Sequence, residues 1–247
     1  MLCVMDAALQ DIVAASDRIV FFGGAGVSTE SGIADFRSAN GLYNQVTGAH
    51  YSPEELLSHS FFTSHTAEFY AYYRANLVHP KAKPNDAHRA LASLERAGKL
   101  SSVITQNIDG LHQAAGSKRV IELHGSVHRN YCMSCGRRHG LDEVLSSAKI
   151  PHCACGGVIR PDVVLYEEPL DQAVITAALE ELGAADTLIV GGTSLVVYPA
   201  AGLIRAFHGE TIVLINRDAT PFDHLATLVI HESIGATLGR FVTDANG

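Results

Sequence analysis

The sequence predicts an α/β fold in which one doubly wound parallel sheet carries two inserted segments. β-rich apolar runs recur along the chain and end in small or polar residues, at 18–22, 102–105, 187–191 and 211–215. Amphipathic helical patterns lie between them, at 86–97 and 170–182. Strands that alternate with helices in this way form right-handed crossover units around a parallel sheet.

Two stretches interrupt the alternation. Residues 41–85 are rich in aromatic residues and His and contain the turn-prone HPKAKP, so we expect a helical insertion there. Residues 126–160 hold four clustered cysteines and show little strand pattern. We therefore divide the chain into a helical insertion, a cysteine-containing module and one main domain, which comprises 1–40, 86–125 and 161–247.

Length and composition indicate a folded, water-soluble protein. The chain has 247 residues, of which 47% are hydrophobic and 18% charged, a balance that supports a packed core. The net charge of −8 argues against direct binding to nucleic acid, which needs clustered Lys and Arg. No apolar run approaches the roughly 20 residues that cross a bilayer, and the N-terminal MLCVMDAALQD lacks a basic region before an apolar one. We expect a cytoplasmic monomer without a membrane partner.

A glycine-containing turn directly follows the first predicted strand. The backbone N–H groups of Gly24, Ala25 and Gly26, with the start of the next helix, are suited to hold a pyrophosphate, as in a Rossmann-like domain. The usual dinucleotide fingerprint has a third glycine where Thr29 stands. A tight strand-to-helix turn without a ligand explains the glycines equally well.

An acid, an aromatic ring and a cation come next, at Asp35, Phe36 and Arg37. An aromatic face excludes water from a flat ring, and the planar donors of an arginine hold phosphate or ribose oxygens. A solvated Asp–Arg pair beside a core phenylalanine is the alternative interpretation.

Polar residues follow the second predicted strand, at the carboxyl end where open α/β sheets bind ligands. Asn107 and Asp109 carry the donor and acceptor atoms that a carboxamide requires, although a capped turn also uses such residues. His124 ends another strand-like run, VIELHG, and a histidine in that position is suited to act as a general base. Because the chain has thirteen histidines, a structural role for His124 is the competing interpretation.

Two close cysteine pairs, Cys132/Cys135 and Cys153/Cys155, are separated by seventeen residues. This spacing brings four thiolates into one tetrahedron and is typical of zinc. Four sulfur ligands leave no open position for water, so we expect a structural Zn²⁺ that stabilises a small module. Free thiols or a redox disulfide are the alternatives, and a metal site of this kind indicates a reducing compartment.

Taken together, these motifs resemble the sirtuin family. The matching segments are GAGVSTESGIADFR (24–37), TQNIDGLH (105–112), ELHG (122–125), the cysteine pairs, GTSLVVYPA (192–200) and INRD (215–218). The resemblance covers nearly the whole chain and implies a bacterial-type minimal catalytic core that acts as an NAD-dependent protein-lysine deacylase. Such an enzyme uses NAD as a co-substrate, moves the acyl group from lysine to ADP-ribose and releases nicotinamide. Its partners are acylated-lysine proteins or peptides.

The resemblance also implies roles for individual residues. His124 is the expected catalytic base, and Asn107 is the second catalytic residue, beside the nicotinamide pocket. Asp35 and Phe36 shield the reacting face from water, because hydrolysis of NAD is the competing reaction. The implied cofactor-binding residues are Gly24, Ala25, Gly26, Thr29, Asp35, Phe36, Arg37, Gln106, Asn107, Ile108, Asp109, His124, Gly192, Thr193, Ser194, Asn216, Arg217 and Ile234. The residues implied to sandwich the peptide as an added strand are Val164, Leu165, Tyr166, Val196 and Val197.

Two features depart from the family pattern. Ala34 stands where the family usually has proline, which loosens the loop over the cofactor without removing a reacting group. Members that prefer succinyl-lysine have Tyr and Arg three residues apart, whereas Tyr70 is followed at that spacing by Tyr73, with Arg74 one place late. We therefore expect deacetylation in preference to desuccinylation.

Other functions explain part of the same pattern. An NAD-dependent dehydrogenase fits the fold and the glycine turn, but Thr29 and the lack of a clear acidic residue after a second strand near residue 45 count against it. A non-catalytic sensor of NAD or ADP-ribose leaves His124 without a role. Deacylation of longer or succinyl chains and mono-ADP-ribosyl transfer are the alternatives within the family.

Overall fold

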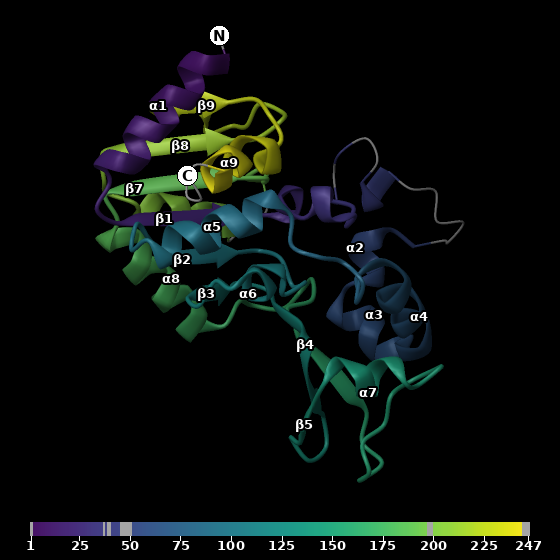
Figure 1. Cartoon of the computed structure of the whole chain (residues 1–247). Coiled ribbons are helices and arrows are strands. Elements are labelled where there is room, and N and C mark those ends of the chain that lie inside the picture. Colours follow the sequence, from purple (N-terminus) through teal and green to yellow (C-terminus); the bar gives the residue numbers. More distant parts are fainter. Residues whose placement is uncertain (1, 37, 39–40, 45–50, 197–199, 244–247) are drawn as a thin grey trace.

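The computed structural model describes residues 2–36, 38, 41–44, 51–196 and 200–243. A six-stranded parallel sheet forms the centre, with the strand order β3-β2-β1-β7-β8-β9 (Figure 1). The chain runs outward from β1 to β3 and later returns beside β1 with β7, so the doubly wound α/β fold predicted from the sequence is confirmed. The strands are β1 Ile19–Gly23, β2 Leu100–Thr105, β3 Val120–Glu122, β7 Thr187–Gly191, β8 Thr211–Ile215 and β9 Leu228–Ile230.

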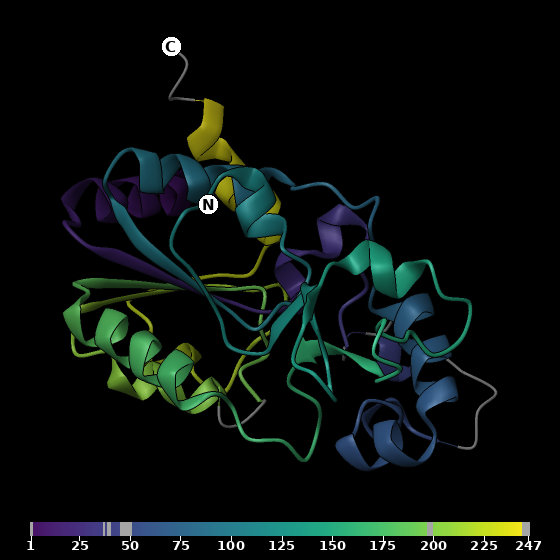
Figure 2. The ribbon, with the colours of Figure 1, turned by 90° about the horizontal axis from the view of Figure 1, so that it is seen from below.

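Alternate side chains of these strands form two hydrophobic cores, one on each face of the sheet. In β1, Val20 and Phe22 belong to one core, and Ile19 and Phe21 to the other. Every residue of β1 is buried, because a parallel sheet covered by helices on both faces has no side exposed to water. Helix α8 covers one face and helices α1, α5 and α9 the other (Figure 2). Their bounds are α1 Leu2–Ala15, α5 Asp86–Arg96, α8 Gln172–Ala184 and α9 Ile234–Thr243.

The covering helices begin where a side chain satisfies their first N–H groups. The side chain of Asn85 accepts hydrogen bonds from the N–H groups of Ala87 and His88 at the start of α5. Asp171 caps α8 in the same way. The two helices predicted from the sequence are confirmed, and their ends are shifted by at most two residues.

The two inserted segments lie beyond the carboxyl edge of the large sheet (Figures 1 and 2). The first is helical, and the second contains an antiparallel sheet of order β5-β4-β6 with one short helix. A third hydrophobic core joins them, because Phe69, Tyr70 and Tyr73 of the first segment belong to one cluster with Val144 and Ile159 of the second. The elements are α2 Pro53–Leu56, α3 His59–Ser64, α4 Thr66–Asn76, β4 Gly125–Cys132, β5 Arg138–His139, α7 Leu141–Leu145 and β6 Ile159–Val163.

The small sheet is a finding that the sequence pattern did not suggest. β4 reads GSVHRNYC, and its register against β6 shifts between Ser126 and Asn130. Such an irregularity interrupts the alternation of apolar and polar residues by which a strand is recognised. Residues 126–160 therefore form a small antiparallel sheet although their sequence shows little strand pattern.

Short helical turns connect the remaining parts of the chain. They are η1 Ala25–Val27, η2 Thr29–Ser31, η3 Leu42–Asn44, α6 Leu111–Ala115, η4 Ala200–Ala206 and η5 Asp223–Leu225. Among the described residues, no helix has both the length and the apolar character that crossing a membrane requires.

Replacement of Leu182 by Ala should destabilise the protein strongly. Leu182 is 0% exposed in the core beneath α8, so Leu182→Ala removes buried methyl groups and leaves a cavity. We expect the free energy of unfolding to fall by about 2–5 kcal/mol, measured from urea unfolding. Leu179→Ala on the same helix is the matched control. Because Leu179 is 38% exposed, this variant should lose far less free energy of unfolding. Equal losses for the two variants would contradict the packing described here.

Candidate functional site

A cavity of about 490 Å³ lies where the carboxyl ends of β1, β2, β7 and β8 face the inserted segments. Parallel strands place the residues that follow them along one edge of the sheet, so segments far apart in the sequence meet there. Nearly all of the residues predicted to bind the cofactor line this cavity. They are Gly24, Ala25, Gly26, Thr29, Asp35, Phe36, Gln106, Asn107, Ile108, Asp109, His124, Gly192, Thr193, Ser194, Asn216, Arg217 and Ile234. Arg37, the remaining one, lies outside the described residues.

The glycine turn after β1 packs directly against the turn after β7. The N–H of Gly26 donates a hydrogen bond to the carbonyl oxygen of Gly192 at 2.8 Å. A Cβ on Gly26 would lie 2.8 Å from the Gly192 Cα, and a Cβ on Gly192 would lie 2.4 Å from the backbone nitrogen of Val27. Gly192 also has φ +58, which side chains disfavour. These contacts show why both positions need glycine.

The segment after β1 differs from the sequence expectation in one respect. An α-helix was expected to begin directly after the glycines, but two short 3₁₀ turns, η1 and η2, follow instead. The hydroxyl of Thr29 donates to the carbonyl oxygen of Gly26 at 2.9 Å and closes the turn on itself. Thr29 thus takes part in the local fold at the position where a dinucleotide fingerprint has its third glycine.

A polar cluster around the buried Ser28 connects the glycine turn with the segment after β2. The hydroxyl of Ser28 donates to Asp109 Oδ2 at 2.6 Å, and Asn107 Nδ2 donates to Ser28 Oγ at 3.1 Å. Asp109 Oδ1 also accepts from the N–H of Leu111 at 2.9 Å. Burial raises the pKa of Asp109, and the hydrogen bonds from Ser28 and Leu111 partly counter this rise.

Ser28 was not among the predicted site residues, although it lies in the quoted motif GAGVS. It is 1% exposed and holds Asn107 and Asp109 at one oxygen. The one sign in the sequence was the place of Ser28 directly after the glycines, at the carboxyl end of a strand. That place marks Ser28 as a site candidate but does not show which residues, about eighty positions later, it meets.

His124 is fixed in one orientation by the segment after β2. Its Nδ1 lies 2.9 Å from the carbonyl oxygen of Gln106, and a carbonyl only accepts, so Nδ1 carries the proton and Nε2 has a free lone pair. Burial lowers the pKa of His124, and the hydrogen bond to Gln106 offsets part of this shift. The imidazole is therefore neutral near pH 7, as a general base must be.

Asp35 and Phe36 form a loop edge on another side of the cavity. Asp35 Oδ1 accepts from the N–H of Ser38 at 2.9 Å, and its Oδ2 lies 3.9 Å from an NH2 group of Arg217. The ring of Phe36 lines the cavity and meets Tyr43 edge-on, with 5.5 Å between ring centroids. Asp35 thus pairs with a cation from the end of β8, and Phe36 is both packed and turned to the cavity.

Only one side of the predicted peptide sandwich lines the cavity in the described structure. Val164, Leu165 and Tyr166, directly after β6, contribute to the wall. The N–H of Val164 donates to the carbonyl oxygen of His124 at 3.0 Å, which joins this wall to the histidine. Val196 is 47% exposed and is not among the lining residues, and Val197 lies outside the described residues.

The four clustered cysteines converge at the end of the small sheet. Their sulfur atoms all lie within 4.8 Å of one another, with 3.4 Å between Cys132 and Cys155 and 3.8 Å between Cys135 and Cys153. Sulfurs bound at about 2.3 Å to one tetrahedral ion stand about 3.8 Å apart, so the set fits zinc. All four positions would be sulfur, which leaves none for a reacting water, and the metal site is structural.

Comparison with known proteins agrees with this arrangement. A model described as the Sir2 family matches residues 24–199. The chain belongs to the Sir2 family. The NAD-dependent protein deacetylase of Clostridium perfringens is 58% identical over 236 residues, which are 95% of this chain and 97% of the relative. That of Clostridium acetobutylicum is 59% identical over 232 residues, 93% of this chain and 95% of the relative.

Solved Sir2 structures share the whole architecture. A structure from work on the mechanism and regulation of Sir2 enzymes has a TM-score of 0.88 at 38% identity and covers 100% of this chain and 99% of its own. A Sir2 structure with a p53 peptide and NAD⁺ has a TM-score of 0.82 at 39% identity and covers 97% of this chain and 98% of its own. The small sheet and the helical segment are therefore part of the family fold.

Replacement of Cys132 by Ser should release the metal. Cys132→Ser leaves three sulfur ligands, so we expect zinc content to fall from about one ion per chain toward zero and the small sheet to unfold. Elemental analysis of the purified protein measures this, and Cys3→Ser is the control because Cys3 lies far from the two cysteine pairs in the sequence. Equal zinc content in both variants would refute the assignment.

Proposed function

We propose that this protein is an NAD-dependent protein-lysine deacetylase, which transfers the acetyl group of acetyl-lysine to ADP-ribose and releases nicotinamide. The convergence of a neutral His124 with the Ser28, Asn107 and Asp109 cluster in one cavity carries the proposal. The names of the Clostridium relatives, which are NAD-dependent protein deacetylases, support it. A sensor that only binds a nucleotide has no use for an oriented base.

The residues around the cavity fit NAD. Its volume of about 490 Å³ lies in the usual range of small-molecule sites, roughly 300–1,000 Å³. The backbone of the turn at Gly24–Gly26 suits a pyrophosphate, and Asn107 suits a carboxamide. The turns after β7 and β8 suit the adenosine half. When bound, NAD would supply the ribosyl carbon to which the acyl-amide oxygen bonds as nicotinamide leaves. The acyl group would then pass to the ribose, and one water would complete the release of the lysine amine.

In this proposal His124 moves the proton that the transfer requires. Its protonated Nδ1 is held by the Gln106 carbonyl, so Nε2 takes the proton of a ribose hydroxyl and leaves that oxygen nucleophilic toward the acyl carbon. Ser28 and Asp109 keep the Asn107 amide in place through the hydrogen bonds described above. Phe36 covers the reacting face and excludes water, which competes for the ribosyl carbon.

The position of Arg74 supports acetyl over succinyl as the acyl group. Its guanidinium donates to the carbonyl oxygens of Val144 and Lys149 and lies over the ring of Tyr70. Tyr70 and Tyr73 are both 0% exposed in the third core. None of these three residues lines the cavity, and Arg217 is the only Lys or Arg among the described lining residues. A succinyl carboxylate would lack the Tyr and Arg partners that it needs.

We also infer the setting in which the enzyme works. Four thiolate ligands need a reducing compartment, which supports the cytoplasm. We retain the division into a main domain of 1–40, 86–125 and 161–247 with insertions at 41–85 and 126–160, although the shared third core indicates that the insertions fold as one unit. A monomer that binds no nucleic acid is consistent with the net charge of −8.

His124→Ala should abolish acyl transfer and largely preserve NAD binding. Loss of a general base lowers the rate by about 10²–10⁴, whereas the remaining cavity residues still hold the nucleotide. Mass spectrometry of acetyl-lysine and succinyl-lysine peptides, with and without NAD, measures turnover and nicotinamide release, and calorimetry measures binding. His208→Ala, at an exposed histidine, is the control. A wild-type protein that never releases nicotinamide would overturn the proposal. ADP-ribosylated protein as the product would favour the alternative function, a mono-ADP-ribosyltransferase.

The acid limb of the pH profile should have its midpoint below the ordinary histidine pKa of 6.5. His124 must be neutral to act, and burial lowers its pKa, so more than half of the maximal activity should remain at pH 6.5 and be lost as pH falls further. The measurement is kcat/KM against pH, which reports the groups of the free enzyme. A limb centred above pH 7 would contradict this assignment of the base.

A further inference from the structure

The turn after β6 contains a residue in an unusual backbone conformation. Glu167 has φ +75, and within the described chain only Leu195 shares a positive φ among residues other than glycine. The N–H of Glu168 donates to the carbonyl oxygen of Leu165 at 3.1 Å, which places Glu167 third in a four-residue turn. That position with positive φ favours glycine, because a Cβ is strained there.

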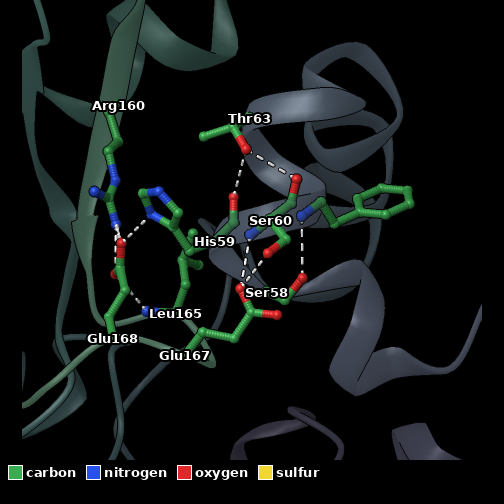
Figure 3. Close-up of polar contacts among 9 residues, drawn as sticks. Ser58, His59, Ser60, Thr63, Arg160, Leu165, Glu167 and Glu168 are labelled. Carbon is green, nitrogen blue, oxygen red and sulfur yellow. Dashed lines mark hydrogen bonds and ion pairs between the residues drawn. The ribbon is translucent and has the colours of Figure 1, made fainter.

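The carboxylate of Glu167 is bound to the first turn of α3 (Figure 3). Its Oε2 accepts from the backbone N–H of Ser60 at 2.9 Å and from the Ser60 hydroxyl at 2.6 Å. The backbone of the preceding residue, Tyr166, is bound at the same helix start. The N–H of Tyr166 donates to the carbonyl oxygen of Leu57, and the N–H of His59 donates to that of Tyr166, both at 3.0 Å. The Glu167 side chain and the Tyr166 backbone therefore both attach the strained residue to the start of α3.

The neighbouring Glu168 has a different set of partners. It accepts from Arg160 at 2.6 Å, from His59 Nδ1 at 2.7 Å and from the backbone N–H of Leu165 at 2.9 Å (Figure 3). Its charge is balanced by the Arg160 guanidinium, which is only 12% exposed. Glu168 thus fixes the turn through Arg160, His59 and Leu165. The strained residue itself is held by the contact between Glu167 and Ser60.

We propose that Glu167 is a positioning residue for the substrate peptide, acting through Ser60 to hold the turn against the cavity. Strained backbone persists only where the surroundings determine it, and here the determinant is the carboxylate on α3. Without it, Glu167 relaxes to negative φ and moves Tyr166 and Glu168, which both line the cavity, out of the wall that receives the peptide. The inference rests on the proposed deacetylase function for its kinetic readout.

Three replacements of Glu167 separate the side-chain anchor from the backbone strain. Glu167→Ala keeps a strained Cβ and loses the anchor, so the peptide KM should rise about tenfold with little change in kcat or in the KM for NAD. Glu167→Gly removes the backbone strain as well as the side-chain anchor, so the peptide KM should rise only about twofold. Glu167→Gln keeps an acceptor for Ser60 and should restore most of the wild-type KM. Glu180→Ala, at an exposed glutamate of α8, is the control.

Ser60→Ala provides a second test through a double-mutant cycle. Alone it removes the hydroxyl donor and should raise the peptide KM about two- to threefold, whereas in the Glu167→Gly background it should have no further effect. The proposal is overturned if the Ala and Gly variants have the same KM, if kcat or the NAD KM changes instead, or if the Ser60→Ala effect is undiminished in the double variant.

Hydrogen exchange gives a readout that does not depend on activity. The amides of Leu165, Tyr166 and Glu168 are hydrogen-bonded in the turn, so they should exchange about tenfold faster in Glu167→Ala than in Glu167→Gln. Equal exchange in the two variants would overturn the anchor. A wild-type protein without deacetylase activity would overturn the proposed function only, because the exchange rates still decide whether Glu167 holds the turn.

Discussion

The close contact between two strand-end turns determines where the rest of the site lies. Gly26 and Gly192 approach each other so tightly that neither has room for a Cβ, and their hydrogen bond joins the ends of β1 and β7. Because β1 and β7 are also neighbours in the sheet, the turn has a fixed direction as it leaves the sheet. Ser28 is thereby brought onto Asp109 and Asn107, and the polar cluster follows from the glycine contact.

The second wall of the cavity depends on a different kind of interaction. The two inserted segments share one hydrophobic core, so the helices of the first and the small sheet of the second form a single support. The turn after β6 is attached to this support at α3 and to His124 through Val164. The cavity is therefore enclosed between a rigid sheet edge and a separately packed unit. The segment between them carries Glu167, which is the one described lining residue other than glycine with a positive φ.

Burial shifts the pKa values of Asp109 and His124, two of the titratable groups of the site, in opposite directions. It raises the pKa of Asp109 and lowers the pKa of His124, because it disfavours the charged form of each. Hydrogen bonds from Ser28 and Leu111 counter the shift at Asp109, and the Gln106 carbonyl counters it at His124. The same burial that excludes water from the cavity thus keeps the histidine neutral and holds Asp109 in a defined network.

Much of this protein is determined by local sequence. The strands are recognisable as apolar runs because both faces of the sheet are buried. The cysteine pairs indicate a metal because their spacing is typical of four ligands around one ion. Only the tertiary structure decided that Ser28 meets Asp109, that β4 pairs irregularly with β6, and that Glu167 takes a glycine-like conformation. The physical reason is that these features depend on contacts between segments far apart in the chain, for which no local spacing or propensity carries a signal.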